Sequence, residues 1–154
     1  MQEAGVKDDS VKGEEPRVRM ISPGDRTTIG TIIFFPGEEV DISPTAADEL
    51  RKIADKLSGK PQKIEVRGHA SRRPLSEDNP IQDHTELAYK RARNVAQFLI
   101  EEMKIDPPRV RIAVAGANEP LSDSSEPTKI DENSRVEVFL LEELVEDEDA
   151  KTPF

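Results

Sequence analysis

Residues 43–59 read SPTAADELRKIADKLSG, and this stretch carries the clearest helical pattern in the chain. Ser43 is a favourable N-cap residue, Pro44 suits the first helical position, and Gly59 is a typical stop. Between them the apolar residues recur at helical spacing on one face: Leu50, Ile53, Ala54 and Leu57. We therefore expect an amphipathic helix that packs one side against a core.

The segments around this helix follow the pattern of strands. Residues 17–21 (RVRMI) alternate weakly, and residues 31–35 (TIIFF) form an apolar run of β-branched and aromatic residues. The turn SPGDR lies between them, so we expect two strands there. Residues 62–67 alternate again, with Ile64 and Val66 on the same side. This alternation indicates a third strand that buries one face in the core.

A second amphipathic helix follows a polar loop. Residues 86–103 (ELAYKRARNVAQFLIEEM) place one apolar stripe on a helix, made of Leu87, Ala88, Ala92, Val95, Ala96, Leu99 and Met103. Residues 109–116 (RVRIAVAG) and 135–141 (RVEVFLL) then alternate as strands. The order is strand, strand, helix, strand, helix, strand, loop, strand. We therefore predict an α/β fold, a two-layer sandwich in which two main helices cover one face of a small mixed sheet.

The net charge of −10 lies mostly at the two ends of the chain. The chain has 22 basic and 32 acidic side chains. The two ends, residues 1–16 and 142–154, together hold 3 of the basic and 11 of the acidic ones, which leaves 19 basic and 21 acidic side chains for residues 17–141. We expect a disordered acidic arm at 1–16, one domain at 17–141 and a disordered acidic tail at 142–154. Such acidic ends would repel a polyanion, so we expect no nucleic-acid partner.

Several kinds of site are not expected from the composition. The chain has no cysteine, so it has neither a disulfide nor a thiolate metal site, and its two histidines belong to no metal-ligand cluster. No nucleophile motif is visible, so no catalytic residue, cofactor or metal is predicted. No run of 18 apolar residues and no signal-peptide layout occurs. We therefore expect membrane contact only through an anchor absent from this sequence.

Several short motifs occur in an order that is typical of one family. They are Gly68-His69, Glu86-Leu87-Ala88, Arg91-Ala92, Pro107, Arg109-Val110, Gly116, Pro120 and Asn133-Ser134-Arg135-Val136-Glu137. With them, residues 29–141 resemble the OmpA-like C-terminal peptidoglycan-binding domain. The long loop RRPLSEDNPIQDH (residues 72–84) makes the resemblance strongest to the MotB-type members, which are like the flagellar stator protein.

The resemblance implies a binding function and no enzyme activity. OmpA-like domains hold the peptide stem of peptidoglycan through its diaminopimelate residue, which carries an ammonium group and a carboxylate side by side. The chain is therefore expected to act in the periplasm or cell envelope, where it would anchor an envelope protein to the cell wall. Its expected partner is peptidoglycan.

One family position differs in a way that affects this function. In the family an arginine binds the ligand carboxylate and an aspartate binds the ammonium group. Arg91 falls on the arginine position, but Ser71 stands at the aspartate position, and a hydroxyl supplies no opposing charge. Three explanations stay open: Asp78 or Asp83 supplies the charge, the ligand differs, or binding has been lost.

Two further departures support an alternative function. His84 and Ala88 replace an asparagine and a serine of the family pattern. The chain could thus be a divergent OmpA-fold module for protein–protein interaction or dimerisation that has lost peptidoglycan binding. An exposed Tyr89 or Phe98 would favour a homodimer. A third alternative, a hydrolase of wall peptides, is suggested only by His69, His84 and the acids of the long loop.

The ligand-binding residues predicted from the resemblance are Arg91, Ser71, His69, His84, Asp83, Asn133 and Arg135. Several of them have a structural alternative. Arg91 lies beside the apolar stripe and could be a buried, paired residue. His69 could shape the exit of its strand, while Asn133 and Arg135 could hold a turn and the last strand.

Overall fold

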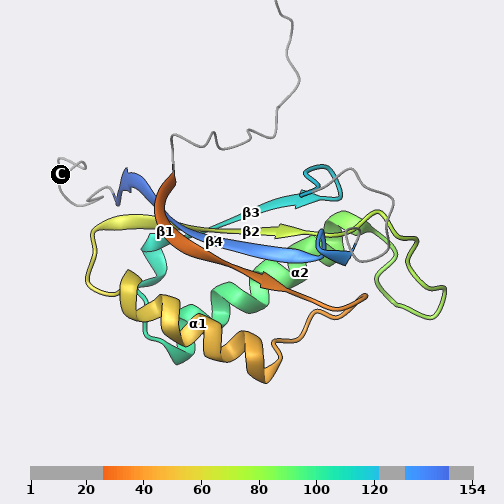
Figure 1. The fold of residues 1–154 in the computed structure, drawn as a ribbon, viewed down its shortest axis with the longest axis horizontal. Helices are drawn as coiled ribbons and strands as arrows, with labels where there is room; N and C mark the ends of the chain where they lie inside the picture. The colour runs from red at the N-terminus through yellow and green to blue at the C-terminus, as the bar shows by residue number, and fades with distance from the viewer. Residues whose placement is uncertain (1–25, 122–130, 146–154) are drawn as a thin grey trace, which may run out of the picture.

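The computed structural model describes residues 26–121 and 131–145, which form two layers (Figure 1). One layer is a four-stranded sheet with the strand order β1-β4-β2-β3. The strands are β1 (Arg26–Phe34), β2 (Gln62–His69), β3 (Val110–Gly116) and β4 (Arg135–Leu144). β2 and β3 are parallel, whereas β4 is antiparallel to both β1 and β2. The predicted mixed sheet is confirmed.

The second layer consists of two helices on one face of the sheet, α1 (Pro44–Leu57) and α2 (His84–Gln97). α1 begins where the sequence predicts. The side chain of Ser43 accepts a hydrogen bond from the backbone N of Ala46 at 3.1 Å. This bond satisfies one of the amide groups that a helix leaves unpaired at its start.

α2 begins earlier in the chain than predicted, because Asp83 caps it. Oδ1 of Asp83 accepts a hydrogen bond from the backbone N of Thr85 at 2.9 Å, so His84 becomes the first helical residue. At its other end α2 passes into a π-helical turn, η2 (Phe98–Glu102). A short 3₁₀ helix, η3 (Pro107–Arg109), then leads into β3.

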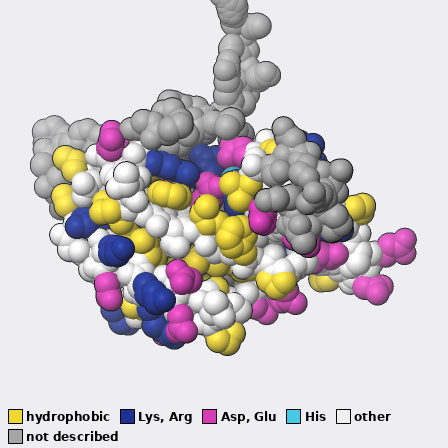
Figure 2. Space-filling view, in the orientation of Figure 1, with side chains coloured by type: hydrophobic (Ala, Val, Ile, Leu, Met, Phe, Trp, Pro, Cys, Tyr) yellow, Lys and Arg dark blue, Asp and Glu magenta, His cyan; other side chains and the backbone are white. Residues whose placement is uncertain are grey.

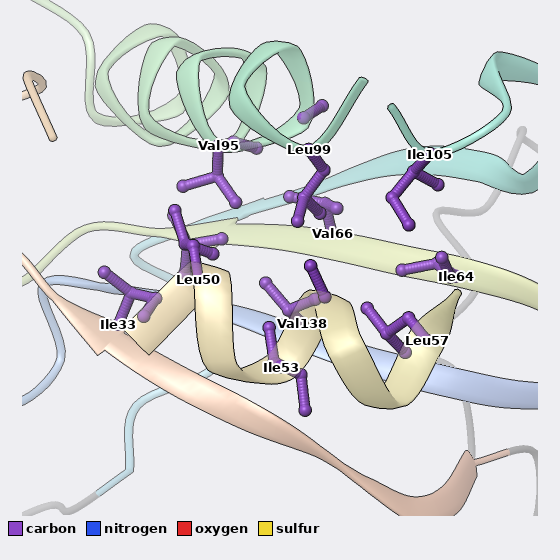
Figure 3. Packing of buried hydrophobic residues seen from close by; sticks show 14 of the residues in the cluster. Ile33, Leu50, Ile53, Leu57, Ile64, Val66, Val95, Leu99, Ile105 and Val138 are labelled. Carbon is purple, nitrogen blue, oxygen red and sulfur yellow. The ribbon is translucent and has the colours of Figure 1, made fainter. Parts of the chain in front are cut away.

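The core lies between the sheet and the helices, and Figure 3 shows side chains of both layers meeting there. The residues labelled in that view are Ile33, Leu50, Ile53, Leu57, Ile64, Val66, Val95, Leu99, Ile105 and Val138. All of them are buried, and burial of one such side chain contributes about 1.5–3 kcal/mol. This packing holds both helices over the sheet and thereby fixes the end of β2 beside the start of α2.

Gly68 allows α2 to approach β2 very closely at this end of the sheet. A Cβ atom at Gly68 would lie 2.0 Å from the carbonyl oxygen of Ala88 and 3.0 Å from the Cβ of Ala92. The space beside the strand is therefore filled by the helix itself, and a residue without a side chain is required.

Some predictions fall outside the described residues. These are the strand at 17–21, the arm at 1–16 and the tail from 146 onward. β4 continues past the predicted domain end at 141 as far as Leu144. The backbone N of Val145 then donates to the carbonyl oxygen of Pro61 at 3.0 Å, which keeps this segment against the start of β2.

Candidate functional site

A small cavity lies where the end of β2, the start of α2 and the β1–α1 loop meet. Its volume is about 70 Å³. Since a water molecule occupies roughly 30 Å³ in the liquid, the cavity has room for a small group. We call it the cradle; it is lined by Gly37, Glu38, Ser71, Arg73, Pro74, Leu75, His84 and Leu87. Two predicted site residues, Ser71 and His84, are among them.

A wider and more open groove of about 560 Å³ adjoins the cradle. It is lined by residues 36–41 of the β1–α1 loop together with Ser76, Asp78 and Asn79 of the long loop. Gly37 and Glu38 line both hollows. Figure 2 shows acidic side chains at the projecting end of the long loop, on the right of the view. The two hollows together leave room for a ligand that is longer than the group in the cradle.

Arg91 lies directly behind the cradle, and its exposed fraction is 0 %. Its Nε donates to the carbonyl oxygen of Glu39 at 2.7 Å, and its Nη2 donates to that of Gly37 at 2.7 Å. Its Nη1 donates to the carbonyl oxygen of His69 at 3.2 Å. The guanidinium carbon also lies 5.4 Å from the centre of the Phe35 ring. Arg91 therefore ties the β1–α1 loop to the end of β2.

Its surroundings keep Arg91 charged but inaccessible. Burial lowers the pKa of Arg91 to about 10, and the attraction of Glu38 and Glu39 opposes this decrease. The guanidinium therefore stays protonated at neutral pH. Arg91 does not line the cradle, so a ligand there meets the loop that Arg91 holds. The sequence motif predicts the position of Arg91 on the helix, but nothing in the motif indicates its three backbone partners.

Ser71 and His84 both hold the backbone of Arg73. Oγ of Ser71, which is 8 % exposed, accepts a hydrogen bond from the backbone N of Arg73 at 3.3 Å. Nε2 of His84 lies 2.8 Å from the carbonyl oxygen of Arg73, so a neutral His84 ring donates from this nitrogen. Asp83 and Asp78 do not line the cradle, because Asp83 caps α2 and Asp78 lines the wider groove.

Glu38 is a cradle residue that the sequence analysis missed. Its Oε1 accepts hydrogen bonds from Nδ2 of Asn79 at 2.6 Å and from Oγ of Ser76 at 3.2 Å. Its Oε2 accepts one from the backbone N of Ser76 at 2.9 Å. The hydrogen bond from Asn79, followed by the backbone bond from Ser76, holds the pKa of Glu38 below its usual range. The sequence predicts an acid from the long loop, Asp78 or Asp83, whereas Glu38 comes from the β1–α1 loop.

Asn133 and Arg135 lie away from the cradle, in a buried polar network on the sheet face opposite the helices. The network consists of Arg26, Glu65, Arg67, His69, Glu119, Asn133, Arg135 and Glu137. Nε of Arg135 donates to Oε2 of Glu137 at 2.7 Å, and its Nη2 donates to the carbonyl oxygen of Glu119 at 2.9 Å. Oδ1 of Asn133 accepts from the backbone N of Leu121 at 2.7 Å. These contacts agree with the structural alternative for both residues.

His69 takes part in both regions. Its carbonyl oxygen accepts a hydrogen bond from Arg91 behind the cradle, while its side chain, 1 % exposed, belongs to the polar network. Nε2 lies 3.5 Å from Oε1 of Glu137, which is too far for a strong hydrogen bond, and neither ring nitrogen has a hydrogen-bond partner among the described residues. Burial lowers the pKa of His69, although Glu137 opposes the decrease. The ring is therefore mainly neutral at neutral pH.

The described parts of the chain contain no group of three or more His, Cys, Asp or Glu side chains that could hold a metal ion. Within the same ranges, no helix has the length and apolar character needed to cross a membrane. What the cradle does offer is one carboxylate, one guanidinium, an imidazole and a hydroxyl. This set is suited to binding a small charged group through hydrogen bonds.

The region that contains the cradle matches a known family. The OmpA family model covers residues 34–134, which include α1, β2, α2 and β3. The chain belongs to the OmpA family. This confirms the resemblance drawn from the motifs around Gly68 and Arg91. No curated protein sequence matches the chain.

Several solved structures share the fold of this OmpA family member. The periplasmic domain of Helicobacter pylori MotB is 23 % identical, with a TM-score of 0.64 over 82 % of this chain and 83 % of that one. The C-terminal domain of Helicobacter pylori MotB is 26 % identical, with a TM-score of 0.61 over 70 % and 80 %. The cell wall anchor of the T6SS from Pseudomonas aeruginosa is 23 % identical, with a TM-score of 0.62 over 70 % and 74 %. The predicted similarity to MotB-type members is confirmed at the level of the fold.

Proposed function

We propose that this chain is a non-catalytic peptidoglycan-binding module that acts in the periplasm and anchors a cell-envelope protein to the cell wall. Membership of the OmpA family supports this proposal, as do neighbours described as a periplasmic domain and as a cell wall anchor. The observation that carries it is the cradle, a small charged hollow between the end of β2 and the start of α2.

The proposed ligand is the peptide stem of peptidoglycan, bound through its diaminopimelate residue. The side-chain end of that residue carries an ammonium group next to a carboxylate, and it is small. A cradle of about 70 Å³ suits such a group, while the adjoining groove of about 560 Å³ leaves room for the rest of the stem. Affinity would come from charge-assisted hydrogen bonds, and it should therefore decrease as salt is added.

Co-sedimentation with insoluble peptidoglycan tests this function. The purified chain is mixed with diaminopimelate-type wall and, as a matched control, with wall in which lysine replaces diaminopimelate and removes the carboxylate beside the side-chain ammonium group. We expect retention on the first wall only, and weaker retention at about 0.5 M salt than at about 0.05 M, because salt screens exposed charges. Recovery of the protein in the supernatant with both walls would contradict the proposal.

A second candidate is a protein–protein interaction or dimerisation module that does not bind peptidoglycan. The complete burial of Arg91 favours it, because the side chain expected to meet the ligand carboxylate instead binds three backbone carbonyls. Tyr89 on α2 is 43 % exposed and could contribute to a contact between copies, whereas Phe98 is half-buried against the core. Two results together would support this candidate. Sedimentation velocity would show a dimer that Tyr89→Ser dissociates, and co-sedimentation would show no retention on the wall.

A further inference from the structure

The charges of the cradle differ from those expected from the family pattern. Ser71 supplies no charge, and Arg91 is buried behind the cavity. Among the described residues that line the cradle, Glu38 is the carboxylate and Arg73 is the guanidinium. They come from two segments far apart in the chain, the β1–α1 loop and the long loop, which meet at this cavity.

We propose that Glu38 and Arg73 form the charge pair that recognises the ligand, with Glu38 binding an ammonium group and Arg73 binding the neighbouring carboxylate. This inference rests on the proposed peptidoglycan-binding function. It defines the ligand as an amino-acid end group with a free ammonium and a free carboxylate on the same carbon. The two residues would replace the pair that the family pattern places at Ser71 and Arg91.

Glu38 is held in a way that suits a binding role. Arg91 binds the carbonyl oxygens of the residues on both sides of it, Gly37 and Glu39, so the backbone of Glu38 is fixed. Its carboxylate is ionised and accepts three hydrogen bonds from the long loop. Because a carboxylate has about four acceptor sites, it can accept a further hydrogen bond from an ammonium group.

Arg73 is also fixed through its backbone. Ser71 binds its amide N and His84 binds its carbonyl oxygen, which explains why these two polar side chains lie at the cavity. Its Nε donates to Oδ1 of Asp131 at 2.7 Å, and the two side chains are 45 % and 55 % exposed. Exposed ion pairs contribute little to stability, so a ligand carboxylate can share or replace Asp131 at low cost. A planar guanidinium also suits a carboxylate better than a lysine ammonium does.

The test compares native diaminopimelate-type wall with the same wall after N-acetylation, which removes the ammonium charge. Glu38→Gln removes the proposed partner of that charge and keeps the length of the side chain. Glu77→Gln is the matched control, because Glu77 is an exposed acid of the long loop outside the cradle. Arg73→Gln removes the proposed partner of the carboxylate, and Arg72→Gln, at the neighbouring residue, is its control. These two variants are compared on native wall and on wall whose diaminopimelate carboxylate is amidated.

We expect the wild type to bind native wall at least about tenfold more tightly than acetylated wall, as is typical of a hydrogen bond between charged groups. Glu38→Gln should bind native wall about tenfold less tightly than the wild type and should no longer distinguish the two walls. If Glu38 only held the long loop in place, Glu38→Gln would instead weaken binding to both walls equally and would still distinguish them. Arg73→Gln should lose discrimination between native and amidated wall, while both control variants behave as the wild type.

Two results would overturn the charge pair and leave the proposed function intact. One is a Glu38→Gln variant retained on native wall as well as the wild type. The other is a Glu38→Gln variant that still distinguishes native from acetylated wall. A wild type retained on neither wall would contradict the peptidoglycan-binding function itself, and the charge pair with it.

Discussion

Replacing Arg91 by methionine should destabilise the whole domain, because Arg91 connects three parts of the backbone. The carbonyl oxygen of His69 lies at a buried strand end, and loss of its partner costs about 1–3 kcal/mol. The carbonyl oxygens of Gly37 and Glu39 belong to exposed loop residues that water can reach, so each lost bond costs only about 0.5–1.5 kcal/mol. The expected loss is about 2–6 kcal/mol, a large part of the roughly 5–15 kcal/mol that stabilises a typical domain.

Urea unfolding followed by circular dichroism measures this loss. Arg91→Lys serves as the comparison, because it keeps the positive charge but concentrates its donors on a single nitrogen. We expect its stability to lie between those of the wild type and Arg91→Met. If Arg91→Met unfolded at the same urea concentration as the wild type, with the same slope, Arg91 would not be the structural connection that we describe.

Two further predictions concern the sheet. Gly68→Ala should lower stability by at least about 1–3 kcal/mol, because its Cβ would lie 2.0 Å from the carbonyl oxygen of Ala88; an unchanged thermal midpoint would contradict this close contact. Because the pKa of His69 is lowered in the folded protein, the unfolded chain binds the proton more readily than the folded one. The free energy of unfolding should therefore be unaffected by His69 above the usual histidine pKa of about 6.5 and should decrease as the pH falls through that value. Urea titrations between about pH 7 and 5 should show a smaller decrease in His69→Gln, and an equal decrease would assign the effect to other groups.

Local sequence signals were sufficient for most of the fold. Ser43 and Pro44 predicted the start of α1, and the apolar spacing up to Leu57 predicted its buried face. Alternation in β2 and β4 predicted which side of each strand faces the helices. These features depend on neighbouring residues, so a single sequence contains them. The start of α2 differs from the prediction by two residues, because the side chain of Asp83 caps the helix at His84 and not at residue 86.

The partners within the site could not be predicted in the same way. Glu38 and Ser76 are 38 residues apart, and Arg91 is 54 residues from Gly37. Contacts over such separations depend on how the β1–α1 loop and the long loop meet beside the end of β2, and no local pattern reports this.

The buried polar network was missed for a different reason. Its members on β2 and β4 alternate with core residues, so the pattern places them on the outer face of the sheet without indicating their burial. Glu65 and Arg67, for example, are both buried and pair with each other. Glu65 also pairs with Arg26 of β1, and Arg67 also pairs with Glu119.

The central claim is that the cradle binds the zwitterionic end of a peptidoglycan stem. The most direct test is to titrate the ¹⁵N-labelled chain with a soluble stem peptide that ends in diaminopimelate, and to follow the amide signals. We predict saturable shifts at Glu38, Ser71 and Arg73, with residues of α1 unaffected. A titration to millimolar peptide that moved no cradle signal, or that moved only signals elsewhere, would contradict the claim.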